Sequence, residues 1–264
     1  ATLVCIRVIA RHSGGAEARL AAFKLLATLL HGAQSPARDT MACFLIQNHK
    51  VCSGFFQACA SVLDNAANLI RDYTRNVRLA RERAQGKEAA VEAGGADEDE
   101  DEAAGATNME EWIGRQGHAM LLLRVIQLMC AGDTAQVLQD LVSLQPRSAV
   151  NFDLVSRLLD IFSRAQPLLW DSARFNNDAT LLLFNLQVAE TLSAVCRGPH
   201  ERNQRLALAS NFLSAVNRIF ATLLYVAEDA TPGGSVGHVT LDKTADETAH
   251  VRLNDVICWF KEAV

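Results

Sequence analysis

The apolar residues of this chain recur mainly at intervals of three and four, the spacing that places side chains on one face of an α-helix. Between residues 16 and 31, for example, Leu20, Phe23, Leu26 and Leu30 share such a face. Leu and Ala dominate these segments, β-branched residues are sparse, and no stretch shows a convincing strand pattern. The pattern therefore predicts an all-α fold.

Helix start and stop signals divide this pattern into about ten helices. The segments expected to be apolar and helical are 2–12, 16–31, 37–50, 53–84, 109–130, 135–144, 150–165, 178–196, 201–228 and 248–264. Ser53 is the expected N-cap of the fourth segment. Residues 166–177, which contain Pro167, are expected to be irregular.

Two segments interrupt the helical pattern. Residues 85–108 hold Gly, Ala and the acidic run Asp97–Glu102 with little to bury, which predicts a disordered linker. Residues 229–247, rich in Gly and Thr, are predicted to be a flexible loop. The sequence thus predicts five parts: a helical part at 1–84, the linker at 85–108, a second helical domain at 109–228, the loop at 229–247 and the start of a further helix at 248–264.

The helices are expected to pack as antiparallel neighbours with short connections. Units of two helices per about 40–47 residues are typical of armadillo and HEAT repeats. Because the units do not repeat closely in sequence, we predict an irregular armadillo/HEAT-like α-solenoid.

Composition narrows the class of protein. Half of the 264 residues are hydrophobic and only 5 are Pro, which allows a sizeable core, and the formal net charge of −5 gives no overall signature of nucleic-acid binding. No window holds 18 uninterrupted apolar residues and no signal peptide is recognisable, so we expect no membrane contact by this stretch. The chain starts at Ala1 and ends at Val264 within an apolar pattern, which predicts a fragment of a longer protein.

The seven Cys residues form an odd set without repeated spacing. Most lie within apolar helical patterns, namely Cys43, Cys59, Cys130 and Cys258. Buried free thiols in a reducing, cytosolic setting are the simplest interpretation.

Motifs that carry chemistry are missing from the sequence. There is no nucleophile elbow, Walker loop, HExxH or dinucleotide fingerprint, so we predict no enzyme, no catalytic residue and no cofactor. Cys43, His49 and Cys52 could begin a zinc site, but zinc takes about four ligands and no matching pair follows. We interpret them as core Cys beside a surface His and predict no metal site. The run Asp97–Glu102 lacks the offsets of an EF-hand, so a solvated linker is favoured over a Ca²⁺ site.

Basic residues form a stripe late in the fourth segment, at Arg71, Arg75, Arg78, Arg81 and Arg83. A nucleic-acid site would need further basic clusters and interleaved aromatic residues, which are missing. We interpret the stripe as a solvated helix face; contact with an acidic partner surface is the alternative.

The stretch VCRGPHERNQ raises the question of a Cys196–His200 site. Gly198 and Pro199 lie between the two residues and prevent one helix face from holding both. A structural corner explains more. Gly198 would end one helix and Pro199 would open the next, while Asn203 and Gln204 could bond backbone groups left free at the helix ends.

At these residues the sequence resembles the RyR and IP₃-receptor homology-associated (RIH-associated) domain of inositol trisphosphate and ryanodine receptors. That family carries a helix reading Phe-Leu-Gln-Leu-Leu-Cys-Glu, a later Asn, and a Gly-Pro motif followed by Asn-Gln. The matching residues here are Gln127, Leu128, Cys130 and Asn151, then Gly198, Pro199, Asn203 and Gln204. The likeness covers most of 20–225, with His200 and Ala131 standing where the family has Cys and Glu.

The resemblance implies a function and a setting. It implies a non-catalytic cytosolic segment of a ligand-gated calcium-release channel that relays conformational change toward the pore. The implied partners are neighbouring domains and the other subunits of a homotetramer, and the implied location is the cytoplasmic face of the endoplasmic reticulum membrane. The alternative is a helical-repeat interaction scaffold without channel activity.

Overall fold

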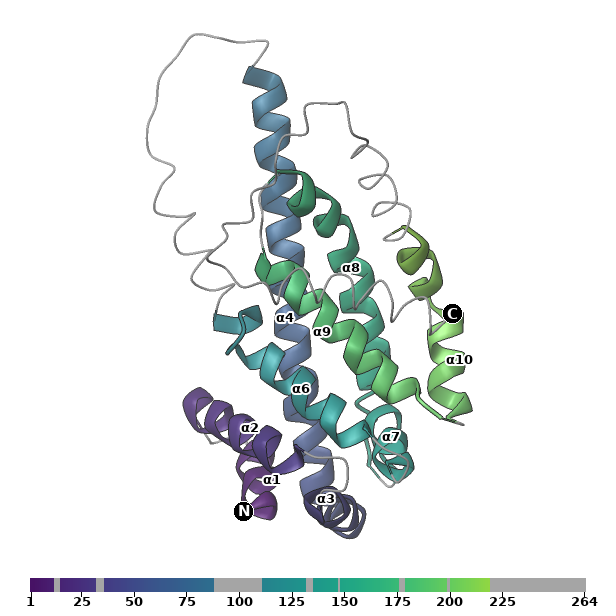
Figure 1. Ribbon diagram of the computed structural model, residues 1–264. Helices are drawn as coiled ribbons and strands as arrows, with labels where there is room; N and C mark the ends of the chain where they lie inside the picture. Colours follow the sequence, from purple (N-terminus) through teal and green to yellow (C-terminus); the bar gives the residue numbers. More distant parts are fainter. Residues whose placement is uncertain are drawn as a thin grey trace, which may run out of the picture. The chain divides into compact units, whose positions relative to one another are not determined.

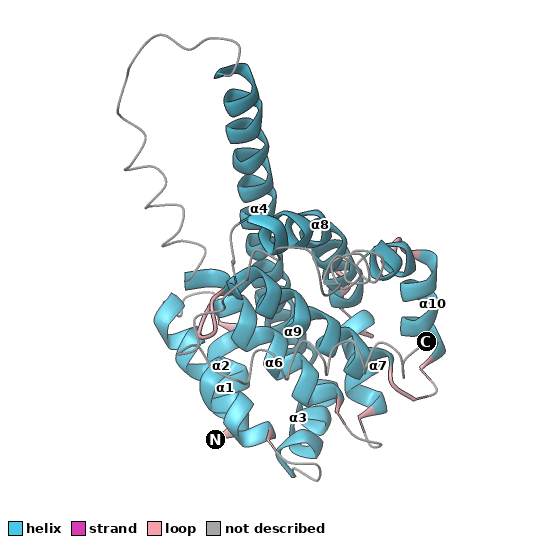
Figure 2. Cartoon of the chain, turned by 45° about the horizontal axis from the view of Figure 1, so that its top comes forward, coloured by secondary structure: helices cyan, strands magenta, loops and turns pink. Residues whose placement is uncertain are grey.

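The computed structural model describes residues 1–11, 15–31, 36–87, 111–131, 135–146, 148–175, 179–198 and 200–218. Within these ranges the fold is all-α, as predicted, and Figure 2 shows helices joined by loops without a strand. The helices are α1 Thr2–Ala10, α2 Ala16–Leu30, α3 Pro36–Gln47, α4 His49–Lys87, α6 His118–Cys130, α7 Gln136–Ser143, α8 Leu154–Phe175, α9 Ala179–Cys196 and α10 Glu201–Ala209.

Most of the extensive contacts join helices that are not consecutive in sequence, with α8 and α9 as an exception. α4 lies against α8 and α1, α2 lies against α6, and α9 lies against both α6 and α8 (Figure 1). Five of the largest fully buried side chains are aromatic: Phe23, Phe55, Phe56, Phe162 and Phe184. Each contributes about 1.5–3 kcal/mol through burial, so this shared core holds the helices together.

The contacts of Ala1–Asn217 form one compact unit. Helices of the segment 1–84 therefore pack directly on helices of the segment 109–228. The solenoid repeat and the five-part division stay predictions. Residues 88–108, 229–247 and 248–264 lie outside the described residues.

α4 is longer than predicted at both ends. It begins at His49 rather than after Ser53, because Asn48 ends α3 and its carbonyl oxygen accepts the first α4 bond from the amide of Cys52 at 2.9 Å. It continues to Lys87, three residues into the predicted linker. The expected apolar face is buried at Phe55, Phe56, Cys59, Val62, Leu63, Ala66 and Ile70.

The helix predicted over 109–130 is interrupted. α6 begins only at His118, after a turn in which the Gly117 amide donates to the Gly114 carbonyl at 2.8 Å. A Cβ on Gly117 would lie 2.6 Å from the Trp112 backbone, so the turn needs glycine there. Apolar spacing runs through this turn, which is why the pattern did not reveal it.

α8 corrects the prediction of an irregular segment at 166–177. The helix runs from Leu154 through Pro167 to Phe175. A proline removes one backbone donor, but the residues after it include strong helix formers such as Leu168, Leu169 and Ala173. Helix propensity here outweighs the lost bond.

The long helix predicted over 201–228 also breaks. α10 ends at Ala209, and a separate helical stretch covers 212–218. Ser210 makes the break, since its hydroxyl donates to the Ala207 carbonyl at 2.7 Å and accepts from the Phe212 amide at 3.1 Å. Among the described helices none is long and apolar enough to cross a membrane.

Candidate functional site

The candidate site is the corner between α9 and α10. α9 ends at Cys196, and Gly198 then adopts a φ of +75°, a left-handed conformation that glycine reaches without strain. α10 begins at Glu201 with His200 as its N-cap, where Pro199 had been expected to open the helix. Pro199 itself lies outside the described residues.

Asn203 and Gln204 both bond the end of α9. The Asn203 side chain is fully buried, and its Nδ2 donates to the carbonyl oxygens of Val195 at 3.1 Å and Gln139 at 3.2 Å. The Gln204 Nε2 donates to the carbonyl oxygens of Cys196 at 3.0 Å and Gly198 at 2.7 Å. The carbonyls of Val195 and Cys196 in the last turn of α9, which a helix end leaves open, therefore have donors.

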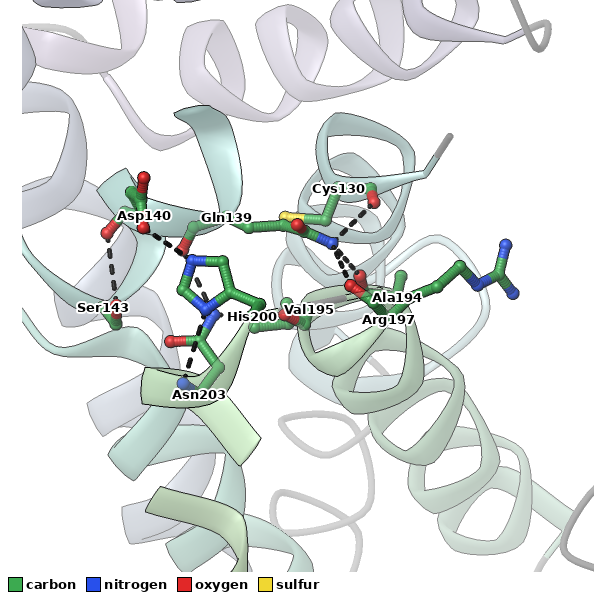
Figure 3. A network of polar contacts seen from close by, with 9 residues as sticks. All are labelled: Cys130, Gln139, Asp140, Ser143, Ala194, Val195, Arg197, His200 and Asn203. Atoms are coloured by element: carbon green, nitrogen blue, oxygen red, sulfur yellow. Dashed lines mark hydrogen bonds and ion pairs between the residues drawn. The ribbon is translucent and has the colours of Figure 1, made fainter. Parts of the chain in front are cut away.

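Gln139 on α7 joins the corner to α6 (Figure 3). Its buried Nε2 lies 2.8 Å from the Ala194 carbonyl oxygen, 3.2 Å from that of Arg197 and 3.4 Å from that of Cys130. One amide thus bridges α6, α7 and the end of α9. Sequence reasoning missed Gln139, because its partners stand 55 and 58 residues away on α9 and after it.

His200 is also part of this network. Its side chain is 4% exposed, and its Nε2 lies 2.6 Å from the Asp140 Oδ1 on α7. Its Nδ1 accepts from the Asn203 amide at 3.4 Å, which assigns the proton to Nε2 and makes Nε2 the donor to Asp140. Sequence reasoning assigned no bond in the corner to His200, but its side chain ties α7 to the start of α10.

Both ring nitrogens of His200 therefore have hydrogen-bond partners, so neither is placed to act as a general base toward a thiol. Burial raises the pKa of Cys196 to about 11 and raises the pKa of Cys130 further. Such thiols stay protonated at neutral pH and are poor nucleophiles. The corner works through hydrogen bonds rather than through Cys–His chemistry.

The other family-motif residues lie on α6 and in the turn before α8. Gln127 accepts from Arg124 at 2.6 Å and from Gln187 of α9 at 3.0 Å, and it donates to Glu190 of α9 at 3.2 Å. The Thr191 hydroxyl lies 3.2 Å from the Leu123 carbonyl and completes a polar seam between α6 and α9.

α3 meets the same end of α6. The Leu128 carbonyl accepts from the Nε of Arg38, a side chain that is only 3% exposed. Asn151 instead closes the turn between α7 and α8: it donates to the Ser143 carbonyl at 3.1 Å and accepts from the Gln145 amide at 3.2 Å. The structure thus brings Cys130 to the corner through Gln139 and leaves Asn151 at a separate turn.

The remaining candidates do not assemble into a site within the described ranges. No three His, Cys, Asp or Glu residues there are grouped to hold a metal ion. Cys43 is exposed, which corrects its interpretation as a core residue; Cys52 and Cys59 are buried, and Cys258 lies outside the described residues. Arg71, Arg75 and Arg78 are exposed on α4.

The fold and the candidate site together define a class of protein. It is an all-α domain in which buried hydrogen bonds at the corner between α9 and α10 join these helices to α6 and α7. Residues 115–220 match the family described as RyR and IP3R Homology associated, in agreement with the resemblance noted in the sequence. The match covers less than half of the 264 residues. No curated protein and no solved structure shows significant similarity to the chain.

Proposed function

We propose that the chain is a non-catalytic regulatory segment of an intracellular ligand-gated calcium-release channel, and that it relays conformational change toward the pore. The observation that carries the proposal is the family match over 115–220. The proposed setting is the cytoplasmic face of the endoplasmic reticulum membrane, within a homotetramer whose neighbouring domains and subunits are the partners.

The corner supplies a physical basis for such a relay. A segment transmits a displacement when its elements move as one body rather than sliding past each other. Gln139, Asn203 and His200 bond α6, α7, α9 and α10 through buried groups, where a broken hydrogen bond costs about 1–3 kcal/mol. A push on one of these helices is therefore passed to the other three.

The test compares two variants of the full-length protein in sealed vesicles loaded with Ca²⁺. Gln139→Leu removes the amide that joins three helices. Arg205→Gln changes an exposed residue whose only ion-pair partner among the described residues is Glu201 on the same helix. Release is triggered with inositol trisphosphate and with ryanodine in parallel. We expect Gln139→Leu to reduce triggered release severalfold at unchanged tetramer content, and Arg205→Gln to behave as the unmodified protein.

A deletion of 109–228 extends the test. Loss of triggered release with retained assembly agrees with the relay. Normal release from both the deletion and Gln139→Leu contradicts it. Absence of Ca²⁺ release from the unmodified full-length protein with either trigger would favour the interaction scaffold instead.

A further inference from the structure

A basic surface hollow lies outside the corner, where α1 meets the start of α4. It is open to solvent and has a volume of about 670 Å³, and its cationic lining comes from Arg7, Arg11 and Lys50. The chain has 30 Asp and Glu residues, yet none of those in the described ranges lines the hollow. In a chain with a net charge of −5, the hollow is therefore a local concentration of positive charge.

Helix packing explains why the cations gather here. Arg7 lies in the last turn of α1, Arg11 is the C-cap residue of that helix, and Lys50 lies in the first turn of α4. Gly54 allows the two helices to touch, since a Cβ there would be 2.8 Å from the Ala10 carbonyl oxygen. This close approach brings the basic end of α1 beside the basic start of α4.

The three cationic side chains are accessible to a partner. All three are exposed, and none of them forms an ion pair among the described residues. The Arg7 guanidinium lies over the Phe44 ring, 5.3 Å from its centroid. Stacking fixes the plane of the guanidinium and leaves its N–H groups at the edge able to donate to a carboxylate.

The spacing of the charges indicates what kind of partner fits. Arg7 and Arg11 are four residues apart, which is about 6 Å along the axis of α1. In an extended peptide, side chains at positions i and i+2 point to the same side and are about 6.6–6.8 Å apart. Two carboxylates at alternate positions of an extended segment therefore match the two guanidinium groups, and Lys50 adds a third charge from α4.

The neutral lining suits a peptide backbone. The hydroxyls of Ser53 and Ser148 lie 3.2 Å apart where α4 meets the turn before α8, and Gln57 adds an amide. Hydroxyl and amide groups both donate and accept hydrogen bonds, as the backbone of a bound segment requires. A single-stranded nucleic acid would instead stack on aromatic residues, and none of the described lining residues is Phe, Tyr or Trp.

We propose that this hollow is a docking surface for an extended acidic segment of a separate partner protein, with carboxylates at alternate positions. Because the hollow is open, a segment within a longer chain can lie in it without threading an end. The hollow lies outside 115–220 except for Ser148 and Ala149, so the proposal does not depend on the proposed relay.

The test is fluorescence polarisation of the full 264-residue chain with a fluorescein-labelled peptide of sequence Ser-Glu-Ser-Glu-Ser-Glu-Ser. We expect this alternating peptide to bind, and its binding to weaken as salt is added, because exposed ion pairs are screened. The matched control peptide Ser-Glu-Glu-Ser-Ser-Ser-Glu has the same composition and no pair of carboxylates at i and i+2. It should bind at least about threefold more weakly.

Two variants of the chain locate the binding. Arg7→Gln/Arg11→Gln should weaken binding of the alternating peptide at least about threefold, because two exposed ion pairs are lost. The matched control Arg164→Gln/Arg205→Gln removes the same charge from exposed residues elsewhere and should leave binding unchanged. Ala149→Glu keeps the arginines, places a carboxylate at the exposed rim of the hollow and should also weaken binding at least about threefold.

Several results overturn the proposal. They are no binding of the alternating peptide, equal binding of the two peptides, and equal weakening by the control pair of substitutions. Binding to phosphatidylcholine vesicles that contain phosphatidylserine, without binding of the peptide, also overturns it. Deletion of 97–102 is the last arm: if the shortened chain bound the peptide at least about tenfold more tightly, the chain's own acidic run would be the occupant, and the assignment to a separate protein would be wrong.

Discussion

Asn203 is the most constrained polar residue of the corner. Its side chain has no exposed surface, its Nδ2 has two carbonyl partners on different helices, and its own amide reaches His200. A side chain without these donors would leave the Val195 carbonyl, in the last turn of α9, unpaired in the interior. The position of these partners therefore requires a short side chain that carries a donor, and packing volume alone does not explain why asparagine stands here.

Asn203→Ala is expected to lower the free energy of unfolding by about 1–3 kcal/mol, the cost of leaving the buried Val195 carbonyl without a donor. Gln204→Ala is the matched control, since its half-exposed amide can be replaced by water and the loss should stay below about 1 kcal/mol. Urea denaturation followed by circular dichroism measures both. Equal losses for the two variants would contradict the role given to Asn203.

Asn185 on α9 is buried at 3% exposure, and neither its Nδ2 nor its Oδ1 has a hydrogen-bond partner. Asn185→Leu, which is close to Asn in shape, should raise the free energy of unfolding by about 1–3 kcal/mol by removing two desolvated polar atoms. The urea midpoint is the measurement. A lower midpoint would show that the amide has a role other than structural.

His118, the first residue of α6, predicts a pH dependence. Burial lowers its pKa below the ordinary 6.5, the nearby Glu111 opposes this, and Arg19 adds to it. The folded chain thus binds this proton less readily than the unfolded chain, and stability falls as the pH drops below about 6.5 toward the folded pKa.

His118→Phe removes this proton and keeps the ring contact with Trp112, whose centroid lies 5.0 Å away. Between about pH 7.5 and pH 5.5 the unmodified chain should therefore lose more stability than the variant. Urea denaturation at both pH values tests this. Parallel losses in the two proteins would assign the pH dependence to other groups.

At the scale of elements, one glycine sets the distance between α1 and α4. A Cβ on Gly54 would meet the Ala10 carbonyl oxygen at 2.8 Å, and a backbone atom can yield only if α1 moves. The favourable helix propensity of alanine, about 1 kcal/mol over glycine, acts in the opposite direction.

Gly54→Ala is expected to lower the free energy of unfolding by about 1–3 kcal/mol, because overpacking outweighs propensity. Gly15→Ala serves as the control, since no atom lies within 4 Å of a Cβ placed there. Gly15 is the N-cap of α2, where alanine is less favourable than glycine, so the loss should be about 0.5–1 kcal/mol and involves no overpacking. Thermal melts compare the two, and a stabilised Gly54→Ala would mean that α1 moves away without cost.

At the scale of the molecule, the family-matched region does not stand apart from the preceding helices. α4 lies against α8 and α2 lies against α6, so apolar faces of 115–220 are covered by residues before 88. A chain of 111–218 alone should therefore unfold at a clearly lower urea concentration than the full chain. Addition of a 1–87 chain should restore part of the stability. An unchanged midpoint for 111–218 would show that it folds on its own.

Apolar spacing predicted the fold class and several helices, including α2 and α9, because burial of one face controls where those helices form. Apolar spacing did not reveal the turn before His118 or the break at Ser210. At each place a hydrogen bond, from a backbone amide or to a hydroxyl, interrupts the helix although the apolar pattern continues. Apolar spacing also ended the helix at residue 165, before Pro167, where helix propensity outweighs one lost donor.

The corner was predictable only in part. Gly198 and the polar pair Asn203 and Gln204 follow a local rule for helix ends. Gln139 and Asp140 do not, because contacts across some 60 residues depend on how α7 folds against α9 and α10.

The bridging amide of Gln139 has one further consequence. An NH₂ group carries two hydrogens, yet three carbonyl oxygens lie within reach of this nitrogen. One acceptor is always in surplus, so the loss of any one of the three contacts still leaves an acceptor for each hydrogen. The junction is thus redundant: no single carbonyl is needed to keep the Gln139 amide paired.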